Sequence, residues 1–121
     1  MSESLPQITI EDNDRLLRRV LFLHPDFIKP DGTPSSSSFS LKTGEKGLSV
    51  DIERLTTYDR SILDKSRFRL YFLKASFTTQ LGLTNQHDPL PDNYAHALIT
   101  GNFSRSICRL LASFAKRINF P

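Results

Sequence analysis

The feature that most constrains the fold is an amphipathic stretch near the C-terminus. Ser104 is a favourable helix N-cap, and the residues after it carry apolar side chains at the spacing of one helix face. The sequence predicts a helix from Ser104 to Ile118 whose apolar stripe packs on another layer of structure. The residues of that stripe are Ile107, Leu110, Leu111, Phe114, Ala115 and Ile118.

Four short stretches have the composition of β-strands and would supply the other layer. They are residues 39–41, 48–52, 68–73 and 94–100. In the first three, apolar and polar residues alternate, which is typical of strands with one buried face. The first two flank a turn and are expected to form a hairpin, and the third is expected to be a central strand.

A second amphipathic helix is expected near the N-terminus. An acidic cluster at 11–14 suits the positive end of a helix, and Pro25 would end the helix. Between them, Leu16, Leu17, Val20 and Leu21 form a narrow apolar stripe, with Arg15, Arg18 and Arg19 on the other side. A short helix capped by Thr56 or Thr57 is expected to run through Asp64. Residues 75–81 fit either a strand or a helical turn, and 84–93 are rich in turn residues.

Together these patterns predict an α+β fold: a small, mostly antiparallel sheet of three to five strands, packed by N-terminal and C-terminal amphipathic helices. The 121 residues fit a single domain, 1–121, with one core. Residues 1–10 are expected to form an extended arm, and residues 29–38, rich in Pro, Gly and Ser, a flexible loop.

Cysteine usage and hydropathy favour a cytoplasmic location without membrane contact. Cys108 is the only cysteine, so an intrachain disulfide is excluded, and its position on the last helix indicates a small core residue. Residues 1–10 have neither the basic start nor the apolar segment of a secretory signal. The apolar runs are far shorter than the roughly 18 residues of a membrane-spanning helix.

The sequence predicts no metal site and no cofactor. Histidines and nearby acids are scattered rather than spaced as zinc ligands. Gly44 and Gly47 precede an expected strand, whereas phosphate-binding glycine loops precede a helix. The histidines and acids considered are His24, His87, His96, Asp26, Asp88 and Asp92.

His96 is the strongest candidate for chemistry. On its expected strand it shares a face with Tyr94 and Leu98. Two interpretations stay open: a half-buried histidine satisfied by one hydrogen bond, or a general acid or base assisted by Asp51 or Tyr94. Asp51 would be exposed unless another element covers its side of the sheet, and would assist His96 only if their strands are neighbours.

The candidate binding residues are mainly basic. The formal net charge is +3, from 16 Lys and Arg against 13 Asp and Glu, so the distribution of charge matters more than the total. Two helices on one side of a sheet would combine their arginines into a positive surface for phosphates or an acidic protein. These residues are Arg15, Arg18 and Arg19 on the first helix and Arg105 and Arg109 on the last, with Ser35 and Ser36 in the loop.

Several segments resemble a family of short, uncharacterised bacterial proteins that share a similar order of motifs. The segments are LHPDFIKPDG, SSSSFSL, GLSVDIERL and DPLPDNYAHALITG. The resemblance implies that the hairpin and residues 94–101 belong to one functional surface. It implies no activity and assigns no catalytic residue.

On these grounds the sequence predicts a non-enzymatic accessory or protein-interaction module of a bacterial cytoplasmic system, with a protein partner at loop Lys29–Ser38. One alternative is a small enzyme, a hydrolase or one acting on phosphate esters, that uses His96 and grips its substrate with Arg105. The other is a nucleic-acid-binding protein that uses the basic faces of the two helices. A pocket in which His96, Asp51 and an arginine meet would favour the enzyme.

Overall fold

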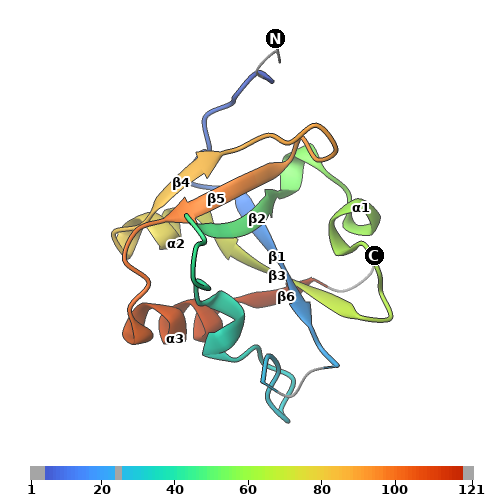
Figure 1. Ribbon diagram of the computed structural model, residues 1–121, viewed down its shortest axis with the longest axis vertical. Coiled ribbons are helices and arrows are strands. Elements are labelled where there is room, and N and C mark those ends of the chain that lie inside the picture. Colours follow the sequence, from blue (N-terminus) through green and yellow to red (C-terminus); the bar gives the residue numbers. More distant parts are fainter. Residues whose placement is uncertain (1–4, 24–25, 119–121) are drawn as a thin grey trace.

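The computed structural model describes residues 5–23 and 26–118, and the fold of these residues is one six-stranded antiparallel sheet with helices on both faces (Figure 1). The strand order is β4-β5-β2-β1-β3-β6. The strands are β1 Arg15–Leu21, β2 Leu48–Ile52, β3 Phe68–Lys74, β4 Thr84–His87, β5 His96–Thr100 and β6 Lys116–Ile118. The helices are α1 Tyr58–Ile62, α2 Ala75–Gln80 and α3 Arg105–Phe114, with 3-10 turns η1 Ser36–Phe39 and η2 Glu53–Leu55. The predicted α+β class with an antiparallel sheet is confirmed, although the sheet exceeds the expected three to five strands.

The predicted N-terminal helix is wrong, because this segment forms the central strand β1. It pairs with β3 along its whole length, from Arg15↔Lys74 to Leu21↔Phe68. Its apolar residues are buried on both faces: Leu16 joins the larger core, while Leu17 joins the smaller cluster on the opposite face. A strand covered on both sides has no apolar/polar alternation, so its pattern imitated a narrow helical stripe.

The predicted hairpin is also wrong in its first strand. Residues 36–39 form the turn η1, where Phe39 is fully buried in the larger core. The neighbours of β2 are β5 and β1, both distant in sequence. A large apolar side chain that enters the core from a turn, followed two residues later by another apolar residue, gives the same alternation as a short strand. The alternation of Phe39 and Leu41 with polar residues was therefore misinterpreted as a strand.

Local signals located most other elements. Thr57 caps α1 by accepting a hydrogen bond from Arg60 N, and Ser104 caps α3 by accepting one from Ile107 N. However, α3 ends at Phe114, and the next residues form the edge strand β6, which pairs with β3. The turn-rich segment contains the short edge strand β4, which the sequence did not indicate.

Apolar side chains form two clusters, one on each face of the sheet. The larger cluster includes Leu48 and Ile52 of β2 and Leu111 of α3, so α3 covers that face. The smaller one joins Leu17, Leu70 and Ile62, the last residue of α1. In Figure 1, α1 and α3 accordingly lie on different sides of the sheet.

The sheet splits between β1 and β2. These strands pair only at Leu16↔Ile52 and Leu17↔Asp51, after which β1 continues beside β3 and β2 beside β5 (Figure 1). Arg18 spans the gap: its Nε donates to Ser38 O (3.0 Å) and its Nη1 to Ser49 O (2.9 Å). Burial lowers the pKa of this guanidinium. The split leaves the face that carries α1 open beside β2.

Candidate functional site

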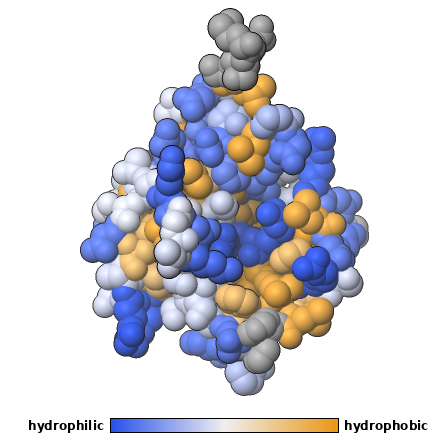
Figure 2. Space-filling view, in the orientation of Figure 1, coloured by the Kyte–Doolittle hydropathy of each residue, from blue (hydrophilic) through white to orange (hydrophobic). Residues whose placement is uncertain are grey.

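A cleft lies in the split, bounded by β1, β2, α1 and the loop that precedes β5. It consists of two adjoining hollows of about 520 and 280 Å³, a size that suits a small molecule. Figure 2 shows this face hollowed beside α1, with hydrophilic residues next to hydrophobic ones. Four residues line both hollows: Arg19, Ser49, Leu63 and His96.

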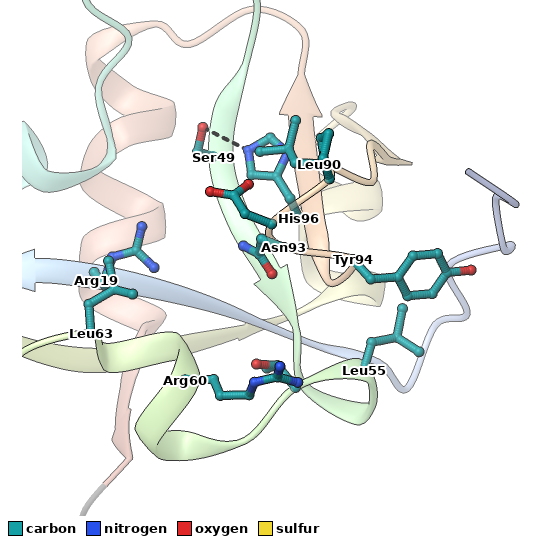
Figure 3. Close-up of a pocket in the computed structure, with 12 residues that line it drawn as sticks. Arg19, Ser49, Leu55, Arg60, Leu63, Leu90, Asn93, Tyr94 and His96 are labelled. Atoms are coloured by element: carbon teal, nitrogen blue, oxygen red, sulfur yellow. Dashed lines mark hydrogen bonds between the residues drawn. The ribbon is translucent and has the colours of Figure 1, made fainter. Parts of the chain in front are cut away.

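Ser49 and His96 are in hydrogen-bond contact inside the cleft (Figure 3). The imidazole Nε2 lies 3.3 Å from the hydroxyl Oγ of Ser49. Nδ1 lies 2.9 Å from the carbonyl oxygen of Asp88 and 3.2 Å from its carboxylate Oδ2. Both of these partners are acceptors, so Nδ1 carries the proton of the neutral ring, and Nε2 accepts from the Ser49 hydroxyl.

The side chain that orients His96 is therefore Asp88 and not Asp51. The carboxylate of Asp88 is 44% exposed, whereas the imidazole is 14% exposed. A carboxylate on Nδ1 with a hydroxyl on Nε2 is the arrangement by which serine hydrolases hold their base. Ser49, His96 and Asp88 come from β2, β5 and the segment just after β4, which are adjacent in the sheet.

Asp51 lies beside His96 but has a structural role. The two residues are register partners in β2 and β5, so the condition that their strands be neighbours is met. The Asp51 carboxylate is buried and accepts hydrogen bonds from Ser61 Oγ at 2.7 Å and Asn93 Nδ2 at 2.8 Å. Because those donors belong to α1 and the cleft loop, Asp51 fastens both walls of the cleft to the sheet.

Arg19 places a positive charge in the cleft. Its Nη1 donates to Ser61 O at 2.8 Å and lies 3.6 Å from Asp51 Oδ2, which fixes the guanidinium. The side chain is about one third exposed. A guanidinium has five N–H donors, so this arginine retains donors for a bound molecule. Figure 3 shows Arg19 and His96 on different sides of the same hollow, with Asn93 near His96 and Arg60 extending from α1.

The cleft rim contains a strained residue. Leu63 follows α1 with φ of 64° and ψ of −56°, a conformation that leucine adopts only under constraint. Its side chain is 67% exposed and lines both hollows. Strained residues gather at functional sites, and this one directs an apolar side chain over the cleft.

Tyr94 lines the cleft but does not assist His96. Its hydroxyl donates to Pro6 O at 2.7 Å, and its ring meets the ring of His87 edge-on. In Figure 3 it points away from His96. His87 is buried and structural: its Nδ1 accepts from Ile8 N, so its Nε2 donates to Tyr94 O.

The remaining predicted binding residues are dispersed, and the positive surface expected from two helices does not form because the first of them is a strand. Arg15 stacks over the Phe72 ring and pairs with Glu53, and Arg18 bridges the sheet split. Arg105 and Arg109 lie on α3, across the sheet from the cleft. The residues Ser35, Ser36 and Arg109 line a separate groove.

The described residues contain no cluster of three or more metal-ligating side chains. Cys108 is buried, and this burial raises the pKa of its thiol. His24 lies outside the described residues. Within the described parts of the chain, no helix has the length and apolarity to cross a membrane.

Sequence reasoning missed Ser49, Asp88, Arg60 and Asn93 as cleft residues. The alternation in β2 places Ser49 on the same face as Asp51. The contact of Ser49 with His96 could therefore have been predicted from the sequence if the pairing of β2 with β5 had been known. Asp88 lies in a turn-rich segment, where no periodicity fixes the direction of a side chain.

Comparison of the chain with protein-family models, with curated proteins and with solved structures gives no match.

Proposed function

We propose that this protein is a small hydrolase that cleaves a carboxylic ester in the cleft. Ser49 is the nucleophile, His96 the general base and Asp88 the residue that orients His96. The observation that carries the proposal is the continuous contact from the Ser49 hydroxyl through His96 to Asp88, in a cleft that also holds Arg19.

The geometry supports a reaction in two steps, acylation of Ser49 and hydrolysis of the acyl-serine. His96 Nε2 takes the hydroxyl proton as Ser49 Oγ attacks the ester carbon, and Arg19 stabilises the negative charge that develops on the carbonyl oxygen. The bond to the leaving alcohol breaks, and the alcohol takes the proton from His96. Water then gives a proton to His96 and attacks the acyl-serine, which releases the acid and returns the proton to Ser49.

This function fits the cleft better than the interaction module that the sequence favoured. An interaction module needs no convergence of polar side chains, whereas here a base, a hydroxyl and a fixed guanidinium from three strands line one hollow. The walls of the hollow are tied together through the buried Asp51, which provides the preorganisation that catalysis requires.

The test is hydrolysis of short-chain p-nitrophenyl esters by the purified protein. We expect Ser49→Ala and His96→Asn each to lower kcat/KM by about 100-fold or more, because each removes one partner of the proton transfer. Asp88→Asn should lower kcat more than it changes KM, because it disturbs the orientation of His96 rather than the binding of the ester.

Ser36→Ala is the matched control, since Ser36 lies in the groove outside the cleft. A fluorophosphonate should label Ser49, as seen by mass spectrometry, and should not label Ser49→Ala. Ester hydrolysis that persists in a folded Ser49→Ala protein, or a label on another serine, would rule out this mechanism.

A further inference from the structure

A second depression lies on the opposite face of the molecule, between residues 29–36 and α3. Its volume is about 580 Å³. The residues that line it include Lys29 and Arg109 and no acidic residue. The lining of the cleft beside α1, by contrast, contains two acids, Asp51 and Asp92, as well as Arg18, Arg19 and Arg60.

The positive charge extends along α3. Arg105 precedes Arg109 by one helical turn, which places the two exposed guanidinium groups on neighbouring positions of the helix surface. Asp31 lies in the loop wall, and its carboxylate accepts hydrogen bonds from the backbone N and Oγ1 of Thr33. These hydrogen bonds, and also the charge of Lys29, lower the pKa of Asp31, so this acid keeps its negative charge near Lys29. The positive charge that is left for a ligand lies mainly on Arg105 and Arg109.

An apolar ridge borders the same groove. Leu110, which lines the groove, is 38% exposed, and Phe114, one turn later on α3, is 58% exposed. The Phe114 ring packs against Phe77 of α2, with ring centroids 4.9 Å apart. Apolar and aromatic side chains beside arginine are the composition that distinguishes protein-binding surfaces.

The loop wall of the groove is preformed. Lys29 N donates to Thr33 O at 2.8 Å, Gly32 N donates to Lys29 O at 2.9 Å, and Ile28 forms a β-bridge with Pro34. Tyr71 Oη donates to Gly32 O from the sheet. A wall fixed in this way loses little conformational entropy when a partner binds.

We infer that this groove binds an acidic segment of another protein, in which carboxylates meet Lys29, Arg105 and Arg109 and an apolar side chain covers Leu110. A nucleic acid fits less well, because its binding rests on neutralising many phosphates, whereas three cations and an apolar ridge are present here. This interface is independent of the ester cleft, which lies on the other face of the sheet.

The test uses a fluorescein-labelled synthetic peptide in which Glu residues alternate with Leu, compared with the same peptide carrying Gln in place of Glu. Fluorescence anisotropy should show binding of the Glu peptide, weakened by added salt, and far weaker binding of the Gln peptide. Amide shifts in NMR spectra should change in residues 29–36 and 105–114.

Charge reversal supplies the specificity control. Arg109→Glu should weaken binding of the Glu peptide at least tenfold, and Leu110→Ser should weaken it with no change in salt dependence. Arg67→Glu makes the same charge change at an exposed arginine outside the groove and should leave binding unchanged. Circular dichroism confirms that each variant is folded.

Three results would overturn the inference: no binding of the Glu peptide, equal binding by Arg109→Glu, or shifts confined to other residues. Tighter binding of a single-stranded oligodeoxythymidine than of the peptide, lost in Arg109→Glu, would instead identify the groove as a nucleic-acid site. None of these results bears on ester hydrolysis, so the two proposals succeed or fail separately.

Discussion

Two buried acids, Asp14 and Asp51, illustrate how single residues hold this protein together. Asp14 accepts hydrogen bonds from Glu11 N at 2.8 Å and from Arg54 Nε at 2.7 Å. The Arg54 hydrogen bond, above all, lowers the pKa of Asp14 below its ordinary 3.8. Asp51 is satisfied mainly by neutral donors. Both carboxylates are matched by donors on other segments, so each fixes a connection between parts of the chain.

Asp14→Asn tests the first of these connections. The amide of asparagine would place a donor where Arg54 and the backbone already donate, so a hydrogen bond to a charged acceptor is lost. We expect the free energy of unfolding at pH 7 to fall by about 1.5–3 kcal/mol, measured by urea denaturation. Glu53→Gln is the control, because its ion pair with Arg15 is largely exposed and its loss should cost under about 1 kcal/mol.

The pH dependence of that difference has a definite sign. A lowered pKa in the folded state stabilises the protein above the unfolded-state value, and the stabilisation disappears as pH falls through the folded value. The gap between wild type and Asp14→Asn should therefore be constant at neutral pH and shrink below about pH 3.8. A gap that stays the same in acid would mean that the charge of Asp14 is irrelevant.

At the scale of elements, the sequence predicted the helix starts and the strands that depend on local interactions. Thr57 and Ser104 identified the starts of α1 and α3, and alternation identified β2 and β3. The sequence failed where tertiary burial decides, as in β1, which is apolar on both faces, and in η1, where Phe39 enters the core from a turn. The alternation of its expected strand gave the face on which His96 lies. Asp88 follows β4 in a turn-rich segment, where no alternation indicates the direction of a side chain.

The α3 boundary follows the same rule. Apolar residues continue at helical spacing to Ile118, yet the helix ends at Phe114 and the chain becomes strand β6. Ile118 packs on the smaller cluster, on the face opposite Leu111. The change from helix to strand brings residues 116–118 into the edge of the sheet and turns the Ile118 side chain toward the opposite face, and no local periodicity indicates that change.

The split between β1 and β2 makes a prediction at this scale. Arg18 donates to the carbonyl of Ser38 in η1 and to that of Ser49 in β2, beyond the two residue pairs that join β1 to β2. Arg18→Met keeps a long apolar side chain but removes both donors, so the free energy of unfolding should fall by about 2–4 kcal/mol. Urea denaturation measures the loss.

Ester hydrolysis should also fall in Arg18→Met, because Ser49 belongs to the strand that Arg18 holds. In Arg18→Met, amide hydrogen exchange should become faster than in the wild type in β2. It should change less in β3, which keeps its full pairing with β1. Unchanged exchange in β2 would show that the strand holds its position without Arg18.

The whole molecule is a sheet with two different surfaces. The face carrying α1 contains the cleft with Ser49 and His96, and the face carrying α3 contains the groove with Lys29 and Arg109. Between them lies the larger apolar core, which includes Leu16, Leu48 and Ile99, all fully or almost fully buried. No polar contact found among the described residues joins Ser49 or His96 directly to α3. The hydrogen-bonded link between the two sides of the sheet runs through Arg18, which donates to Ser49 O in β2 and to Ser38 O in η1.

This arrangement predicts that the two surfaces act independently. Arg109→Glu should bind the acidic peptide at least tenfold more weakly while its kcat/KM for the ester stays within about twofold of wild type, and Ser49→Ala should show the reverse. The double variant should show both losses, because changes at distant sites without shared partners are additive.

Saturating peptide should likewise leave kcat/KM unchanged, because coupling between sites requires an element with two arrangements that both ligands bias. A peptide-dependent change in kcat/KM, lost in Arg109→Glu, would show that packing through the core transmits binding from one face to the other.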